Sequence, residues 1–312
     1  MPFPTDEVLM QTSRDLVAQL QAIFGKHPGF RPAHAKGILL TGTFTPSVGA
    51  AVLTSAPHFN NPSTPITVRF SNSTGIPVIP DTDPNADPRG IAIRFNLGEH
   101  VHTDIVAHST PFFPTRTGAE FLEFLRALAA SSAGGESPSP VEKFLGSHPA
   151  ALAFVQAPKP APTSYAREAY FSVTAFKLIA KDGKATYIRY QVVPDLGVET
   201  LSSTDLAAKG PDYLSEDIAT RLPFTFRLLA QVAEDGDVTN DATVHWAETR
   251  KVVELGVVKV DQVVSPEASA KEQKHIIFDP IPRVKGVEPS DDPLLELRAA
   301  VYLISGKERR AA

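Results

Sequence analysis

The chain has 312 residues, and 42% of them are hydrophobic, so it holds enough apolar material to bury a core. Its 30 Lys and Arg residues against 35 Asp and Glu residues give a net charge of -5, which leaves no basic excess for nucleic acid or an anionic membrane. The absence of cysteine excludes disulfides, thiolate catalysis and cysteine-held metal centres. The acidic start MPFPTDEVLM and the lack of an 18-residue apolar run predict a cytoplasmic protein with neither nucleic acid nor membrane as partner.

The chain opens with an amphipathic pattern. Residues 6–24 place Leu9, Leu16 and Leu20 at helical spacing, and Gly25 offers a stop. This pattern predicts an N-terminal helix.

Short runs of β character follow and predict one antiparallel sheet. They cover residues 37–45, 66–73, 90–97, 224–234 and 257–264. Asp182-Gly183 predicts a tight hairpin between residues 171–181 and 184–193. Because sheet edges need protection, a closed β core that carries helices is favoured.

Helical patterns interrupt and close the sheet. The internal ones cover residues 118–130, 140–145, 203–209 and 213–222. The last helix is the best bounded, since Asp292 suits the N-cap and Pro293 the first helical position. Gly306 is expected to end it.

Phosphate-binding loops, nucleophile elbows and HExxH motifs are absent from the sequence. His34 is an isolated histidine, and such residues are more often structural than catalytic. Arg69 lies in the strand pattern 68–71, and a long charged side chain in a strand usually lies on the solvent-exposed face of the sheet. Arg298 and Tyr302 are neighbours on one helical face. Two interpretations stay open. The Arg298 guanidinium favours a Tyr302 phenolate that can bind a metal, or Arg298 simply stacks on a buried Tyr302.

The order of several motifs resembles the haem catalase family over roughly residues 31–309. The matching segments are RPAHAKG at 31–37, VRFS at 68–71, DPRGIAIRF at 87–95, AFKL at 175–178, FDP at 278–280 and RAAVY at 298–302. The short catalase-related peroxidases, which consist of a minimal catalase core, are the most similar group. The resemblance implies an α+β fold, in which helices surround an eight-stranded antiparallel β-barrel. It also implies a single domain over residues 1–312, with an N-terminal helix at 1–25, the barrel and inserted helices at 30–265 and a proximal haem helix at 291–306.

The same resemblance implies roles for individual residues. His34 would be the distal acid–base group, suited to a near-neutral pKa, with Ser71 hydrogen-bonded to its imidazole. Tyr302 would be the iron ligand and Arg298 would stabilise its phenolate. The contacts implied for haem b are Arg31, Arg69 and Arg309 on the propionates and Phe121 on the ring.

Two positions depart from the family pattern. His108 stands where catalases carry a distal asparagine, so it is either a second catalytic group in the distal pocket or a side chain turned away. Thr174 replaces a histidine that supports the proximal side. The long arms and the C-terminal helical domain of full-length catalases have no counterpart, so no NADPH is expected and a homodimer is compatible with the sequence.

The expected function is a haem peroxidase that reduces hydrogen peroxide or organic hydroperoxides through an oxyferryl intermediate, with a small organic electron donor. Three alternatives stay open: catalase-type dismutation of hydrogen peroxide, rearrangement of hydroperoxides, and a non-enzymatic haem-binding module.

Overall fold

The computed structural model describes residues 3–132, 134–135 and 137–312. Residues 1–2 belong to the predicted N-terminal segment, and residues 133 and 136 belong to the predicted barrel segment. All four lie outside the described residues.

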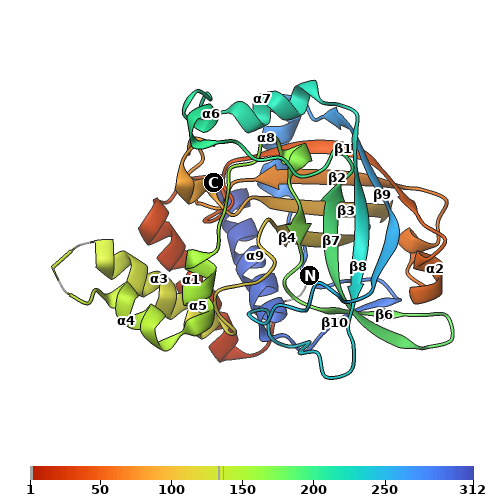
Figure 1. Ribbon diagram of the computed structural model, residues 1–312, viewed down its shortest axis with the longest axis horizontal. Helices are drawn as coiled ribbons and strands as arrows, with labels where there is room; N and C mark the ends of the chain where they lie inside the picture. Colours follow the sequence, from red (N-terminus) through yellow and green to blue (C-terminus); the bar gives the residue numbers. More distant parts are fainter. Residues whose placement is uncertain (1–2, 133, 136) are drawn as a thin grey trace.

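Eight antiparallel strands close into a barrel (Figure 1). In ring order they are β1 (Gly37–Pro46), β2 (Thr64–Ser71), β3 (Gly90–Gly98), β4 (Val101–His108), β5 (Tyr170–Phe171), β7 (Ala185–Pro194), β8 (Phe224–Val232) and β9 (Val252–Val263). Pairing of β7 with β8 closes the ring, while β6 (Phe176–Ile179) and β10 (Val287–Pro289) continue the sheet from β7. The predicted eight-stranded antiparallel barrel is confirmed.

The register of the strands separates an apolar inside from a polar outside. Phe70 pairs with Ile91, and Ile91 pairs with Ala107, and all three side chains are buried in the barrel core. Because side chains alternate along a strand, the residues between them face outward. These outward positions include Arg69 and His108, so the outer face of β2–β4 can carry a site.

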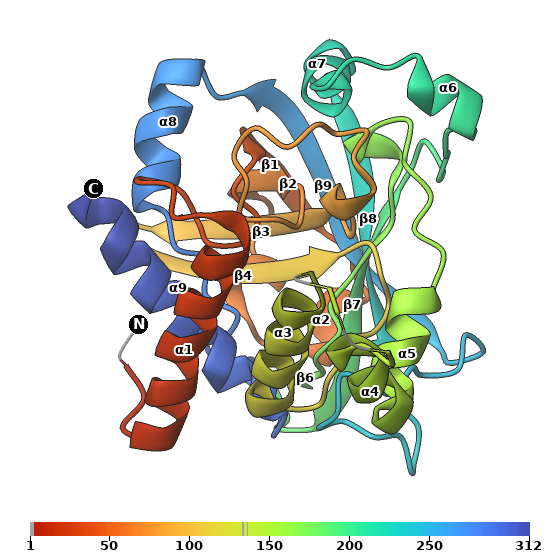
Figure 2. The ribbon, with the colours of Figure 1, turned by 90° about the vertical axis from the view of Figure 1, so that its left-hand side faces the viewer.

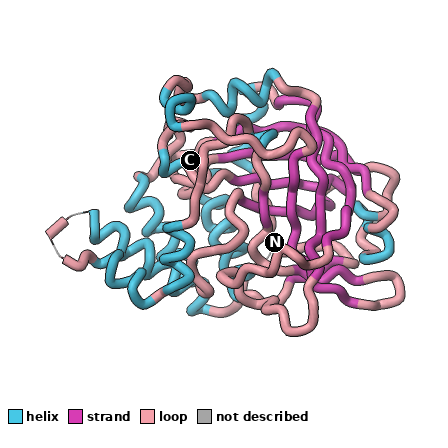
Figure 3. Tube along the Cα trace, viewed as in Figure 1, coloured by secondary structure: helices cyan, strands magenta, loops and turns pink. Residues whose placement is uncertain are grey.

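Two long helices cover this outer face (Figure 2). They are α1 (Glu7–Phe24) and α9 (Pro293–Ala311), which pack against each other and against α3 (Gly118–Ser132). The other helices are α2 (Ala50–Leu53), α4 (Pro140–Ser147), α5 (Pro149–Gln156), α6 (Ser203–Ala207), α7 (Tyr213–Thr220) and α8 (Pro266–His275). Figure 3 shows that α1, α3, α4 and α5 gather on one side of the strands. Within the described residues, no helix combines the length and apolarity needed to cross a membrane.

The start of α9 is as predicted, but its end is not. The Asp292 carboxylate accepts a hydrogen bond from the Leu294 amide at 2.9 Å, which confirms the N-cap. The helix continues through Gly306 to Ala311. A Cβ at Gly306 would collide with Ile277, so this glycine makes a notch for a neighbouring side chain and does not end the helix.

Several elements differ from the sequence-based expectation. The strands β4 and β10 and the helices α2, α5 and α8 were not predicted. The Asp182-Gly183 turn is present, with Gly183 at φ 86°, but its first strand is only β6. Residues 170–171 form the separate strand β5, which pairs with β4 and β7.

Candidate active site

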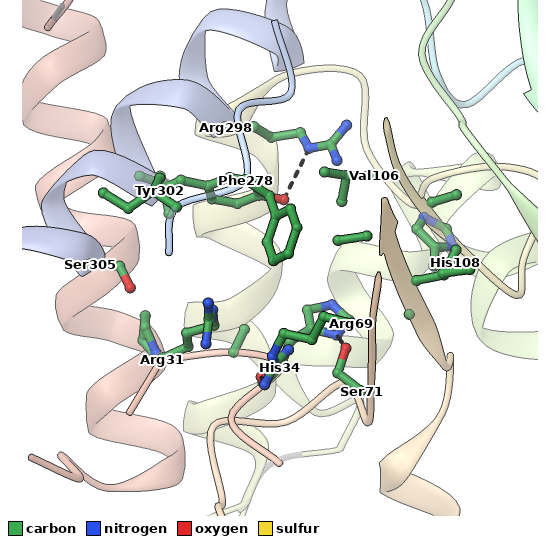
Figure 4. A pocket seen from close by; sticks show the side chains of 18 of the residues that line it. Arg31, His34, Arg69, Ser71, Val106, His108, Phe278, Arg298, Tyr302 and Ser305 are labelled. Carbon is green, nitrogen blue, oxygen red and sulfur yellow. Dashed lines mark hydrogen bonds between the residues drawn. The ribbon is translucent and has the colours of Figure 1, made fainter. Parts of the chain in front are cut away.

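A cavity lies between the outer face of β2–β4 and the helix α9 (Figure 4). Its empty space is ≈ 1020 Å³, with the open solvent at its mouth included. The loop before β1, the segment 277–278 and the side chains of Leu20, Phe113 and Val173 form the other walls. The cavity therefore joins segments from both ends of the chain.

One face of α9 lines the cavity at helical spacing. Its residues are Leu294, Arg298, Val301, Tyr302, Ser305 and Arg309. The Nε of Arg298 donates a hydrogen bond of 3.4 Å to the Tyr302 hydroxyl, and the guanidinium carbon lies 5.8 Å from the ring centre. The Arg298 guanidinium therefore lies against the phenol oxygen of Tyr302 at the wall of the cavity.

The floor of the cavity is a row of residues paired across the strands. Ser71 on β2 pairs with Gly90 on β3, which pairs with His108 on β4. Directly paired residues point to the same face of a sheet. A Cβ at Gly90 would lie 2.9 Å from Ser71 Oγ and 3.0 Å from His34 Nδ1, so only glycine leaves room for the imidazole.

His34 is held in a constrained position at the cavity wall. Its φ is 56°, its amide donates to the Ser73 carbonyl at 3.0 Å, and its Nδ1 lies 3.0 Å from Ser71 Oγ. Burial lowers the pKa of His34 to about 4, and the positive charges of Arg69, Arg31 and Arg298 act in the same direction. The imidazole is thus neutral at pH 7, which corrects the near-neutral pKa expected from the sequence.

Three arginines converge at one end of the cavity, the buried Arg69 and Arg309 and the partly buried Arg31. Arg31 and Arg309 both donate to the Ile276 carbonyl, at 3.0 and 2.8 Å, and Arg69 donates to the His34 carbonyl at 2.9 Å. Burial and mutual repulsion hold the pKa of Arg31 well below its usual value, and burial is the main cause that lowers the pKa of Arg69 and of Arg309 to about 10. In the described part of the chain, none of the three forms an ion pair with a carboxylate, and Arg309 Nε is buried without a hydrogen-bond partner. This end of the cavity suits an anionic ligand.

His108 also lines the cavity. Its Nδ1 lies 2.7 Å from Thr110 Oγ1 and 3.3 Å from the Thr110 amide. Burial, together with Arg298 and His34, lowers the pKa of His108 to about 3, so this side chain is neutral as well.

The structure does not bring Phe121 to the cavity. Its ring packs 5.0 Å from that of Phe113, and Phe113 is among the residues that line the cavity. Val106, Ile277 and Phe278 also line the cavity, a position that the sequence did not predict for them. Val106 lies in the same cross-strand row as Ala92 and Arg69. This row can be recognised only when the strand register is known.

These features define a class of protein: a closed antiparallel barrel with an arginine-rich ligand cavity on its outer face. The chain matches the family described as Catalase over residues 15–311, so it belongs to the catalase family. It is 36% identical over 295 residues to a "Catalase-related peroxidase" of Mycolicibacterium paratuberculosis, which covers 91% of this chain and 90% of that protein. It is 30% identical over 305 residues to a "Catalase-related peroxidase" of Synechococcus elongatus, with 96% and 88% covered.

Solved structures show the same fold. A fungal catalase superimposes with a TM-score of 0.79 at 24% identity, over 95% of this chain and 63% of that one. Catalase A from Saccharomyces cerevisiae gives 0.78 at 22% identity, over 94% and 64%. The chain thus spans less than two thirds of the length of these two catalases.

Proposed function

We propose that the protein is a haem-dependent peroxidase that reduces hydrogen peroxide or organic hydroperoxides with electrons from a small organic donor. Membership of the catalase family and the two relatives named catalase-related peroxidases support this function. The observation that carries it is a single cavity that holds both a neutral imidazole, His34, and an arginine-paired phenol, Tyr302.

Haem is the cofactor that the family implies, and the residues present fit haem b. The arginines Arg31, Arg69 and Arg309 offer unpaired positive charge to two propionates. Apolar side chains such as Ala92 and Val106 line the cavity and would contact the porphyrin ring. Tyr302 would bind the iron, as tyrosine does in catalases.

When bound, haem would supply the redox chemistry through its iron. The chain's own residues would bind and orient the peroxide and move its proton. His34 Nε2 would accept the proton of the peroxide and return it to the leaving oxygen, while Ser71 holds the other side of the ring. Arg298 would stabilise the phenolate of Tyr302, and the apolar side chains Phe113 and Ile277 would limit the entry of water.

The test measures donor oxidation and oxygen release on one haem-loaded sample at equal peroxide concentration. Donor oxidation should dominate, and His34→Ala should reduce it by about 100-fold or more, as expected for the loss of an acid–base group. His100→Ala is the matched control, because the His100 side chain is 94% exposed.

Four results would contradict the proposal. Dominant oxygen release would indicate dismutation, and loss of a lipid hydroperoxide without any donor would indicate rearrangement. Bound haem that does not react with peroxide would indicate a binding module. Unchanged donor oxidation in His34→Ala would remove the role of His34.

A further inference from the structure

Thr110 makes two contacts with one ring nitrogen of His108. Its hydroxyl lies 2.7 Å and its amide nitrogen 3.3 Å from His108 Nδ1, and the threonine is only 3% exposed. A backbone N–H can only donate, so Nδ1 must offer its lone pair. The proton of the neutral imidazole therefore resides on Nε2.

The strand register orients His108 toward the same space as His34. His108 is the direct partner of Gly90, and paired residues share a face of the sheet. The missing Cβ of Gly90 points at His34 Nδ1, from which it would be 3.0 Å away. Both histidines line the cavity, and hydrogen bonds of His108 within the described chain involve Nδ1 alone.

His34 takes the complementary role in the proposed function. Its Nδ1 faces Ser71 Oγ at 3.0 Å. For His34 Nε2 to accept a proton, as the proposed function requires, Nδ1 must carry the hydrogen and donate it to Ser71 Oγ. The lone pair of Nε2 is then left for the cavity.

We propose that Thr110 is a positioning residue that fixes His108 as a neutral hydrogen-bond donor, so that the cavity presents one N–H from His108 and one lone pair from His34. This pair matches a hydroperoxide, whose single O–H donates to His34 while an oxygen accepts from His108. One O–H suffices, so hydrogen peroxide and organic hydroperoxides both satisfy the pair. The substrate part of this inference rests on the proposed function, whereas the tautomer of His108 does not.

The first test is a long-range ¹H–¹⁵N correlation spectrum of ¹⁵N-histidine-labelled protein without ligand. His108 is assigned by the signal that disappears in His108→Asn. Wild type should show the Nε2–H tautomer at His108. Thr110→Val should mix in the Nδ1–H form and raise the pKa of His108, whereas Thr110→Ser, which keeps the hydroxyl, should behave as wild type.

Thr64→Val is the matched control, since Thr64 is 1% exposed and its hydroxyl has no partner in the described chain. An Nδ1–H tautomer in wild type would overturn the inference without any substitution, even if Thr110→Val does not fold. So would a Thr110→Val spectrum identical to that of wild type.

The second test uses the haem-loaded protein. Thr110→Val should raise the KM for hydrogen peroxide by about 2- to 10-fold, the effect of one ordinary hydrogen bond, and change kcat less. A drop in kcat with an unchanged KM would contradict a role in peroxide binding. If the loaded wild type does not turn over peroxide at all, the proposed function fails, while the spectrum still decides the role of Thr110.

Discussion

Gly90 and His34 are fitted to each other across the floor of the cavity. A Cβ at position 90 would lie 3.0 Å from His34 Nδ1 and 2.9 Å from Ser71 Oγ, distances at which one group must move. The imidazole lies where it does because the strand below it lacks a side chain.

Gly90→Ala should therefore displace His34 and reduce kcat/KM for peroxide-dependent donor oxidation. Because small misplacements of a catalytic group are costly, the expected loss is about 10- to 100-fold. Gly146→Ala is the control, since a Cβ there meets nothing within 4 Å and alanine is favoured in a helix such as α4. Equal activity of the two variants would show that the fit at Gly90 does not matter.

The low pKa of His34 predicts the pH at which its ring becomes protonated. With a pKa of about 4, the ring should stay neutral from pH 7 down to about 5 in the protein without ligand, and it should protonate only below that. Removing a positive neighbour in Arg69→Gln should raise the midpoint. An NMR titration of histidine ring signals measures both, and a wild-type midpoint near 6.5 would refute the assigned environment.

The arginine cluster predicts a preference for carboxylates. Haem should bind more tightly than its dimethyl ester, which lacks the propionate charges, by about 10- to 100-fold for each charge-assisted hydrogen bond that the ester cannot form. In Arg31→Met this preference should shrink, because one of the two guanidinium groups that share the Ile276 carbonyl is removed and only Arg309 remains there. Equal affinities of the wild-type protein for haem and for its dimethyl ester, measured by absorbance titration, would show that the arginines do not hold the propionates.

Outside the site, the low pKa of the buried His58 predicts that the fold loses stability in acid. It is 2% exposed, its ring centre lies 4.0 Å from that of Phe59 and 4.6 Å from that of Phe95, and burial lowers its pKa to about 3. The unfolded chain binds the proton near pH 6.5 and the folded chain only near pH 3, so stability falls as the pH drops through this window.

Between pH 6.5 and 4.5 this residue alone should cost about 2.3 kcal/mol of unfolding free energy. In His58→Phe the pH dependence should be smaller by that amount, as urea unfolding at the two pH values can measure. The same pH dependence in variant and wild type would show that His58 does not titrate as described.

The parts of the fold that local signals determine were predictable. The cap at Asp292 and Pro293 and the turn at Asp182-Gly183 depend on neighbouring residues alone, and both are present. The end of α9 was not, because Gly306 serves the distant Ile277. The helix α8 was missed because its sequence PEASAKEQKH is polar and buries only Ser269.

The same division holds for the site. His34, Ser71, Arg298 and Tyr302 lie in short motifs, and the structure brings all four to one cavity. Thr110 and Phe113 have no motif of their own. Thr110 contacts His108 and Phe113 packs against Phe121, contacts that the folded chain defines, and in the structure Phe113 rather than Phe121 lines the cavity.

The most direct test of the account is the absorption spectrum of the haem-loaded protein, compared between wild type and Tyr302→Phe. This substitution keeps the aromatic ring and removes only the oxygen that Arg298 contacts at 3.4 Å. A ferric spectrum typical of tyrosinate ligation in wild type that is absent in Tyr302→Phe is the predicted result. Identical spectra, or no haem band after reconstitution, would contradict the assignment of Tyr302 and with it the proposed function.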